Sequence, residues 1–397
     1  MASKNKKQAT KTSPVFALAL ATAALTINFW AWSLLGPLGS KFAADLSLSP
    51  VGLSVMLAVP VLVGSLARIP FGVLTDRFGG HRVFTAVCFL AILPVMALAF
   101  VDSYNAFLVA GAFLGIAGAS FAVGVPYVNA WFPPQKRGLV LGIYSMGNAG
   151  TAVSGFLTPS LATAFDRQTA YITAAAALLL IGVAFMLWGH DSPTWKRAKG
   201  SAIARLTKAM SSHNTWDLAL LYSISFGAFV AFGVYLPVLL KVSYGLSLTD
   251  AAARAAGFVL LATAARPVGG WLSDHVGGAR VIRTVFAGIA VLSAFVALQP
   301  SLAPATTVAY LSLAFVLGCG NGAIIALVSK LSKPDSIGSV TGIVGACGGL
   351  GGFLPPLILG VTYQRTRSYS LALLGLSLAA ALVFVYISRR FKRIKLA

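Results

Sequence analysis

Long apolar stretches alternate with short polar ones along the whole chain of 397 residues. Most apolar stretches are about 18–25 residues long, which is the length an α-helix needs to cross the hydrocarbon core of a bilayer. Charged residues, often with glycine or proline, separate one stretch from the next. Twelve membrane-spanning helices are predicted, at 15–38, 50–74, 82–101, 105–129, 139–161, 170–189, 217–240, 252–273, 282–299, 306–329, 338–362 and 369–388.

The longest polar interruption is basic, runs from 190 to 216 and divides the predicted segments into six and six. We therefore expect an all-α membrane protein of twelve transmembrane helices in two pseudo-symmetric six-helix halves. Residues 1–189 would form the N-terminal half, 190–216 a cytoplasmic linker and 217–397 the C-terminal half. The short basic N-terminus is predicted to be a cytoplasmic tail before an uncleaved first helix.

Two stretches of seventeen residues indicate that the halves are related. Residues 67–83 read ARIPFGVLTDRFGGHRV, residues 265–281 read ARPVGGWLSDHVGGARV, and the two align without a gap. A second match joins 138–143 to 338–343. Matches in the same order, separated by half the chain, indicate an internal duplication. Parallel repeats of six helices are typical of one large class of transporters.

Each repeat places one arginine, Arg68 or Arg266, inside an apolar segment. Each lies eight residues before an aspartate, Asp76 or Asp274, at which the apolar run stops. Eight residues of helix span roughly 12 Å, and half the hydrocarbon thickness is about 15 Å. Both arginines are therefore predicted near the bilayer midplane, at matched depth. Because a guanidinium there costs at least about 2.5–3.5 kcal/mol, the pair predicts a functional site.

Composition and charge also favour a membrane protein. The chain is 58% hydrophobic and only 10% charged, whereas charged residues form about a quarter of a soluble domain. The net charge is +21, but with both ends cytoplasmic twenty-two Lys and Arg fall on that side and six on the other. This positive-inside bias predicts cytoplasmic termini and contact with anionic lipid head groups. We therefore expect the lipid bilayer, and no nucleic acid, as a partner.

The sequence lacks the acidic partners that buried arginines would need for a structural ion pair. It contains no Glu, and its nine Asp lie in predicted loops or at segment ends. An external anion would satisfy both guanidinium groups, because each planar fork can donate two parallel hydrogen bonds to an oxyanion. No nucleophile or metal-ligand constellation is evident, and the three Cys are scattered. Neither enzyme activity, nor a cofactor, nor a metal is expected.

The glycine-rich turn of each repeat resembles a motif of the major facilitator superfamily. Residues 72–82 read GVLTDRFGGHR, and residues 270–280 are an echo with His275 after the Asp in place of Arg. The resemblance implies the major facilitator fold and alternating access, in which the Asp accepts hydrogen bonds that latch the cytoplasmic side. A plain structural turn is the alternative interpretation. The gating-loop residues are Asp76, Arg77, Arg82, Asp274 and Arg280.

Two further glycine-rich stretches resemble the signature motifs of the nitrate/nitrite porter family. Residues 142–150 read GIYSMGNAG and residues 342–352 read GIVGACGGLGG. The resemblance covers essentially the whole chain and implies nitrate and nitrite as substrates, a plasma (inner) membrane location and a monomer. Close helix packing through small residues is expected at the same positions. The signature glycines are Gly147, Gly150, Gly348, Gly349 and Gly351.

The same resemblance implies which side chains surround the anion. Arg68 and Arg266 would hold a planar, monovalent nitrate between them at the midplane. A tyrosine hydroxyl and an asparagine amide would add hydrogen bonds, and two phenylalanines would form the walls of a flat slot. Core packing or lipid contact is the alternative for each aromatic ring. These additional pocket residues are Tyr222, Asn148, Phe121 and Phe226.

The positions of the titratable residues bear on energy coupling. All four His lie in predicted cytoplasmic loops or at their edges, whereas proton-driven carriers usually hold Asp, Glu or His within the membrane. The sequence therefore favours nitrate/nitrite antiport over nitrate/proton symport. A major facilitator carrier for a small carboxylate, such as formate or oxalate, would also need paired cations and is the closest rival. Duplicated halves with gating loops are typical of carriers and disfavour a channel.

Overall fold

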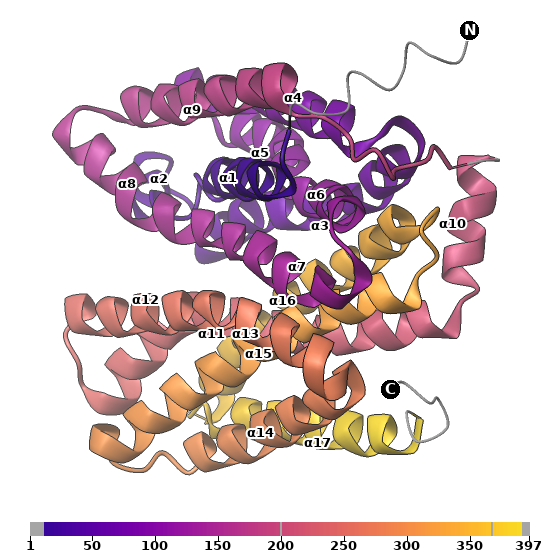
Figure 1. Cartoon of the computed structure of the whole chain (residues 1–397). Coiled ribbons are helices and arrows are strands. Elements are labelled where there is room, and N and C mark those ends of the chain that lie inside the picture. The colour runs from indigo at the N-terminus through magenta and orange to yellow at the C-terminus, as the bar shows by residue number, and fades with distance from the viewer. Residues whose placement is uncertain (1–11, 199–200, 367, 391–397) are drawn as a thin grey trace, which may run out of the picture. The chain divides into compact units, whose positions relative to one another are not determined.

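The computed structural model describes residues 12–198, 201–366 and 368–390, and every regular element in these ranges is a helix (Figure 1). The all-α prediction is confirmed for this part of the chain. The remainder of the predicted basic N-terminal tail and the basic residues beyond Arg390 lie outside the described residues.

The helices follow the predicted apolar segments closely. Those of the first half of the chain are α1 (Pro14–Trp32), α2 (Gly39–Asp45), α3 (Pro50–Phe78), α4 (Gly80–Phe100), α5 (Tyr104–Gly118), α6 (Ser120–Trp131), the 3₁₀ turn η1 (Pro134–Lys136), α7 (Arg137–Ser145), the 3₁₀ turn η2 (Met146–Ala149), α8 (Gly150–Ala164) and α9 (Arg167–Trp188). The linker contains α10 (Ala202–Met210). The second half forms α11 (His213–Tyr244), α12 (Leu248–Ala264), α13 (Arg266–Leu272), the π-helical turn η3 (Ser273–Gly277), α14 (Gly278–Ala297), the π-helical turn η4 (Leu302–Thr306), α15 (Thr307–Leu331), α16 (Ile337–Thr366) and α17 (Ser370–Arg390).

Within the described ranges, nine helical stretches are long and apolar enough to cross a membrane. One of them, Asp250–Ala297, has 48 residues and contains α12, α13, η3 and α14. The chain turns inside it at Gly277, whose φ of 97° lies in the left-handed region that favours glycine. A shorter apolar helix, Ile337–Phe353, forms the first part of α16. The chain is thus a multi-pass membrane protein, and its twelve crossings stay a prediction.

Three predicted segments consist of two helical pieces, although the apolar pattern predicts one continuous helix for each. The divisions fall at Ala119 in 105–129, at η2 in 139–161 and at Ala265 in 252–273. Pro267 explains the last division, because proline has no N–H to donate to the carbonyl four residues earlier. At η2 the Asn148 amide donates to the Ser145 carbonyl at 2.7 Å and competes with the helical pattern.

The first predicted segment is also shorter than expected. Helix α1 ends at Trp32, and residues 33–38 form turns. Gly36 and Pro37 lie in this stretch, and both are poor residues for a helix interior. Apolar composition alone did not show this end, because the turn residues around them are themselves apolar.

The described chain divides into two compact units that largely follow the two halves of the sequence. Unit 1 comprises the described residues up to Pro134 together with Ile143–Ser212 and Ser332–Ala346. Unit 2 comprises Gln135–Gly142, His213–Leu331 and the described residues from Cys347 onward. Each unit therefore includes one short segment from the opposite half of the chain. These segments contain the first turns of α16 and of α7, respectively.

The core of unit 1 is formed by α1, α4, α5 and α9. Helix α4 packs against α9, and α1 packs against α8 and α9 (Figure 1). Their buried faces carry aliphatic and aromatic side chains, among them Trp30, Leu98, Leu114 and Tyr171. The Trp30 indole N–H also donates to the Thr158 hydroxyl at 3.0 Å, which joins α1 to α8.

The predicted linker packs on unit 1 through backbone and side-chain hydrogen bonds. Asp191 accepts from the His81 N–H at the start of α4 at 3.0 Å. The Ser192 hydroxyl donates to the Ala130 carbonyl at 2.7 Å. The Ala198 N–H donates to the Asp76 carbonyl at 3.0 Å. A polar linker thus follows the loops at one end of unit 1 instead of crossing open solvent.

Unit 2 is assembled from α11 to α15 and α17, with α14 packed against both α15 and α17. Asp217, near the start of α11, accepts from the Tyr386 hydroxyl at 2.6 Å and from Arg390 Nε at 3.2 Å. Both donors lie in the last two turns of α17. The buried carboxylate therefore joins the first helix of the unit to its last described one.

We predict that Asp217→Ala lowers the free energy of unfolding of the purified protein by about 1.5–3 kcal/mol, because two hydrogen bonds to a charged group are lost. Asp250→Ala is the matched control, since Asp250 pairs with Arg254 four residues along an exposed helix face. That change should stay below about 0.5 kcal/mol. Thermal unfolding in detergent measures both. Equal effects would contradict the assigned role of Asp217.

Candidate functional site

Arg68 lies in α3 and is only 1% exposed. Its Nε donates to the Gly118 carbonyl at 3.2 Å, and its Nη1 donates to the Gly345 carbonyl at 2.6 Å. The guanidinium carbon lies 5.6 Å from the ring centroids of Trp32 and of Phe121. Carbonyl oxygens and ring faces are the groups that stabilise a cation without neutralising it. Unit 1 thus holds this arginine in a defined orientation with its positive charge retained.

The division between α5 and α6 explains one of these acceptors. The Ala122 N–H donates to the Ala119 carbonyl, three residues back, at 3.0 Å. The regular helical pattern of bonds four residues apart is interrupted at this point. The Gly118 carbonyl lies at the end of α5 and accepts from Arg68. The irregular end of α5 therefore leaves the Gly118 carbonyl as an acceptor for Arg68.

Arg266 is the first residue of α13 and is fully buried. Its guanidinium carbon lies 4.9 Å from the ring centroid of Phe229 and 5.8 Å from that of Phe226. It donates a hydrogen bond to the Tyr222 hydroxyl. The rings of Tyr222 and Phe226 stack with centroids 5.0 Å apart. Unit 2 thus surrounds its arginine with three aromatic side chains from one helix, α11.

These contacts bring several predicted pocket residues to the arginines within each unit. Phe121 lies against Arg68, and Tyr222 and Phe226 lie against Arg266. Two residues at the arginines, Trp32 and Phe229, are absent from the sequence prediction. Phe229 follows Phe226 by three residues, a spacing that places both on one helix face, and this signal could have identified it. Trp32 comes from a separate helix and has no such local signal.

Glycines bring helix backbones together at both arginines. A Cβ added at Gly342 would lie 2.5 Å from the Arg68 carbonyl oxygen in unit 1. One added at Gly142 would lie 2.6 Å from the Arg266 carbonyl oxygen in unit 2. Real Cβ atoms do not approach a carbonyl so closely, so only glycine fits. The repeat therefore reproduces the same crossing at each arginine.

A second crossing lies one helical turn away in each unit. Gly72 meets the backbone of Gly338 in unit 1, and Gly270 meets that of Gly138 in unit 2. Gly338 and Gly342 are four residues apart in α16, so both contacts lie on one face of that helix. The same relation holds for Gly138 and the glycine four residues after it in α7. The close contact between the two helices thus extends along about one helical turn at each arginine.

Asp76 binds the start of α16 at the end of this crossing. Its carboxylate accepts from the Gly338 N–H at 2.8 Å, from the Ser339 N–H at 2.8 Å and from the Ser339 hydroxyl at 2.7 Å. The first N–H groups of a helix have no partners within the helix, and an acidic side chain satisfies them well. This cap explains why residues 332–346 cluster with unit 1.

Asp274 makes the corresponding contacts in unit 2. It accepts from the Leu139 N–H at 3.0 Å and pairs with Lys330 at 3.3 Å. Leu139 lies near the start of α7, 200 positions before Ser339, so the two caps have the same register. The acceptors predicted to latch the cytoplasmic side thus bind backbone N–H groups. The remaining gating-loop residues, Arg77, Arg82 and Arg280, are exposed.

Comparison with known proteins agrees with this architecture. The family model described as Major Facilitator Superfamily matches residues 21–356. The probable nitrate/nitrite transporter NarK2 of Mycobacterium tuberculosis is 45% identical over 370 residues, with 92% of this chain and 93% of the relative covered. The chain belongs to the nitrate/nitrite porter family of the major facilitator superfamily.

Other relatives of the porter carry related names. A nitrite extrusion protein of Bacillus subtilis is 37% identical, covering 93% of both chains. A probable nitrate transporter NarT of Staphylococcus haemolyticus is 35% identical, covering 96% of the porter and 98% of the relative. Among solved structures, the transporter FucP in its outward conformation has a TM-score of 0.77 at 17% identity, with 96% of the porter and 99% of that chain covered. That likeness shows the fold alone.

The signature glycines of the porter also pack against neighbouring helices. A Cβ added at Gly150 would meet the Thr26 carbonyl, and one added at Gly147 would lie 2.7 Å from Leu25 Cβ. Gly348 lies against the ring of Tyr222, and Gly351 lies against the backbone of Ser223. The fifth signature glycine, Gly349, is buried in α16. The expected close packing is therefore present at Gly147, Gly150, Gly348 and Gly351.

Asn148 is the predicted pocket residue with the most local role. It is 2% exposed and lies in η2 of unit 1. Its amide N–H donates to the Ser145 carbonyl, and the backbone carbonyl of Asn148 accepts from the Thr151 hydroxyl at 3.0 Å. These bonds stabilise the short turn between α7 and α8. Its contact with an anion stays a prediction.

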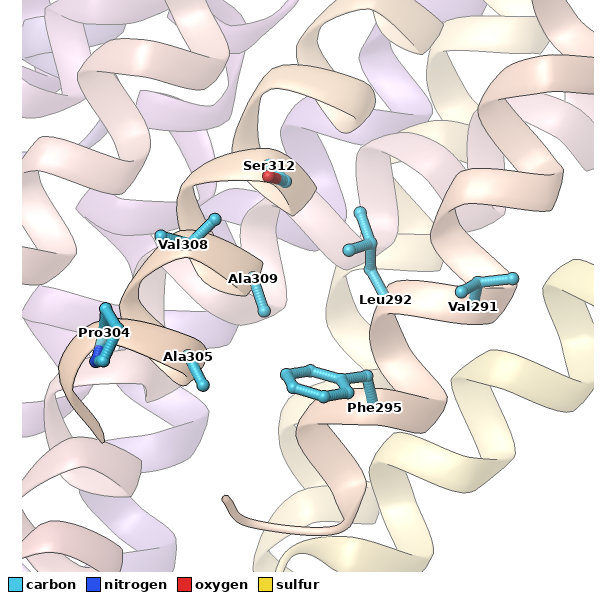
Figure 2. A pocket seen from close by; sticks show the side chains of 8 residues that line it. All are labelled: Val291, Leu292, Phe295, Pro304, Ala305, Val308, Ala309 and Ser312. Carbon is cyan, nitrogen blue, oxygen red and sulfur yellow. The ribbon is translucent and has the colours of Figure 1, made fainter. Parts of the chain in front are cut away.

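A groove on unit 2 provides a contrast to the arginine sites. Figure 2 shows its lining side chains, which come from α14 on one side and from η4 and α15 on the other. The groove has a volume of about 480 Å³ and is lined by Val291, Leu292, Phe295, Pro304, Ala305, Val308, Ala309 and Ser312. Among the lining side chains only that of the serine can form a hydrogen bond, and none of the predicted site residues is in the lining. This apolar surface suits hydrocarbon chains better than an anion.

We predict that Gly150→Ala destabilises the porter by about 1–3 kcal/mol, because the new methyl group meets the Thr26 backbone. Gly155→Ala in the same helix is the matched control, since nothing lies within 4 Å of its added Cβ. That variant should match the parent protein. Thermal unfolding of both purified variants checks the pair. Equal stability of the two would show that the signature glycine is not required for packing.

Proposed function

We propose that this porter moves nitrate and nitrite across the plasma (inner) membrane by alternating access. The observation that carries the proposal is the pair of buried arginines, one in each unit, each in contact with aromatic rings. The names of the relatives support the choice of substrate, since NarK2 and NarT are described as nitrate/nitrite and nitrate transporters. The basic residues at both ends support cytoplasmic termini in the lipid bilayer, and a monomer is the assembly we propose.

Arg68 and Arg266 together would bind one anion. Nitrate is planar and monovalent, and its three oxygens accept hydrogen bonds in one plane, which suits a guanidinium fork. Rings at each arginine favour a flat ligand: Phe121 would wall one side, and Phe226 the other. The sequence places no carboxylate inside the spanning segments to balance these two arginines. A bound anion would offset their positive charge. Tyr222 would donate its hydroxyl to the anion.

The two aspartate caps suggest how binding could be coupled to movement. Asp76 and Asp274 each hold the start of a helix whose next turn crosses the arginine helix at a glycine. A change at either cap would therefore alter the backbone crossing beside the anion. Alternation between two such arrangements is the general principle of carriers built from two repeats. Release of the caps would open the cytoplasmic side.

Exchange of nitrate for nitrite is the coupling we propose. Proton symport is the alternative, and it usually requires an acidic residue or His within the membrane. The nine Asp and four His of this chain lie at the ends of the apolar segments or between them. Formate or oxalate is the alternative substrate. Competition of labelled nitrate uptake by nitrite, chlorate, formate and oxalate distinguishes these substrates.

Proteoliposomes loaded with nitrite should take up external nitrate without a pH gradient, because the internal anion provides the return half of the cycle. Liposomes loaded with chloride serve as the control and should show little uptake. A protonophore should leave the exchange unchanged. Uptake that ignores internal nitrite and collapses with the protonophore would establish proton symport instead.

Arg68→Lys should weaken nitrate binding about ten- to a hundredfold, because a planar fork becomes a point donor and one charge-assisted hydrogen bond, roughly 1.5–3 kcal/mol, is lost. Arg266→Lys should behave alike. If both arginines hold the same ion, the two effects should not be additive in the double variant. Titration calorimetry on purified protein measures the affinities.

Arg68→Ala should abolish transport and leave the protein folded, since a buried charge is removed together with its side chain. The control is Arg254→Ala, whose side chain is 41% exposed and pairs along one helix face; it should retain full transport. A structural role would give the opposite pattern: the Ala variant would unfold or fail to insert, while the Lys variant would bind nitrate normally.

A further inference from the structure

Asn321 is a buried amide in α15 for which neither the sequence motifs nor the proposed mechanism supplies a role. Its side chain is 1% exposed, and neither Nδ2 nor Oδ1 has a hydrogen-bond partner within the described chain. An amide has two donors and one acceptor, and burying them without partners is unfavourable. A group retained under this penalty invites a functional explanation.

The duplication relates Asn321 to a residue that touches the other arginine. Helix α6 ends at Trp131 and α15 ends at Leu331, so the register of the two helices differs by 200 positions. Ten residues before each end stand Phe121 and Asn321. The Phe121 ring lies 5.6 Å from the guanidinium carbon of Arg68. Unit 2 thus has an amide where unit 1 has a ring against its arginine.

Contacts of the neighbouring residues place this part of α15 at Arg266. A Cβ added at Gly322 would meet the Arg266 carbonyl oxygen. The Cys319 thiol donates to the Ala265 carbonyl at 3.6 Å. The backbones of α15 and α13 are therefore in direct contact on both sides of Asn321. This is the same helix pairing that positions Arg266 itself.

A second buried polar group, on α11, lies beside the residue that precedes Asn321. A Cβ added at Gly320 would lie 2.9 Å from Ser225 Oγ. This hydroxyl is fully buried and has no hydrogen-bond partner within the described residues. Ser225 precedes Phe226, whose ring lies 5.8 Å from the Arg266 guanidinium carbon. Two helices, α11 and α15, thus each bring a polar side chain without a partner to the surroundings of Arg266.

We infer that Asn321 is a further anion-binding residue, which donates a hydrogen bond from Nδ2 to an oxygen of the anion held at Arg266. Ser225, on α11, brings a second neutral donor to the surroundings of the same arginine. This inference rests on the proposed function and adds a neutral donor to it. Arginine supplies positive charge, whereas an amide N–H stabilises only an anion that has a second oxygen to accept its hydrogen bond.

The inference therefore concerns selectivity among anions. An oxyanion such as nitrate or nitrite can accept from the arginine with one oxygen and from Asn321 with another. A halide has the charge but presents a single centre, so it gains less from donors at two separate positions. Removal of the amide should weaken oxyanion binding and change chloride binding less than twofold.

The test compares Asn321→Leu with the parent protein, both full length and purified in detergent. Leucine has the same number and branching of heavy atoms as asparagine and no polar atom, so a purely structural residue would tolerate it and the thermal midpoint would stay equal or rise. We expect the Kd for nitrate to rise roughly tenfold, as for the loss of one hydrogen bond to a charged group, with the Kd for chloride within twofold. A nitrate Kd within twofold of the parent would overturn the inference.

Ser293→Ala is the matched control, because Ser293 is also fully buried with a hydroxyl that has no partner in the described chain. It lies near the end of α14, two turns beyond Val285, which is the residue of that helix beside Gly320. It should leave the nitrate Kd unchanged. An equal loss of affinity in both variants would show a general packing effect and would also overturn the inference.

Asn321→Asp provides a second variant if the leucine variant fails to fold. A carboxylate of the same shape beside Arg266 would compete with the ligand, and nitrate binding should be lost while the protein stays folded. Normal nitrate binding by this variant would contradict a location at the anion. The parent protein, titrated with nitrate, nitrite, formate and oxalate, separates the two proposals. Binding of nitrate by the parent with no effect of Asn321 defeats this inference alone, whereas binding of no anion by the parent defeats both.

Discussion

A guanidinium group inside an apolar helix bundle needs hydrogen-bond acceptors and ring faces around it, because hydrocarbon provides neither. Arg68 obtains two carbonyl acceptors and two rings, and Arg266 obtains a tyrosine hydroxyl and two phenylalanine rings. These groups stabilise a cation and leave its charge in place. Each arginine lies beside a division in the regular helix pattern: the end of α5 provides the Gly118 carbonyl to Arg68, and Pro267 divides the helix next to Arg266.

Glycine makes these surroundings possible. The carbonyl of each arginine residue is approached by a glycine of a helix from the opposite half of the chain, and one turn away a pair of glycines brings the two backbones together. Crossings this close leave no room for a Cβ. Glycines of the two signature stretches thus have a packing function, which is compatible with a role beside a small anion. The groove between α14 and α15 has no such polar surroundings, and its lining is apolar.

The same crossings connect the arginines to the loop motif. Asp76 caps the first turn of α16, and residues 342 and 345 of that helix, one and two turns further on, meet the Arg68 carbonyl and guanidinium. Three contacts on one helix therefore depend on a single position of α16. Unit 2 repeats the cap and the crossing with Asp274 and α7. A substrate that alters the position of either arginine would act directly on the helix that the aspartate holds.

The sequence by itself determined the helical membrane class, the duplication and the two buried arginines, because apolar length and repeat register are properties of contiguous segments. It also indicated Phe121, Tyr222 and Phe226 through family resemblance. Only the tertiary structure decided that Trp32 joins them, that α5 and α6 divide at Ala119, and that the start of α16 belongs with unit 1. Those outcomes depend on contacts between residues far apart, such as Arg68 and the Gly345 carbonyl, 277 positions away. Local periodicity carries no information about such pairs, because they form only when helices cross at a particular residue.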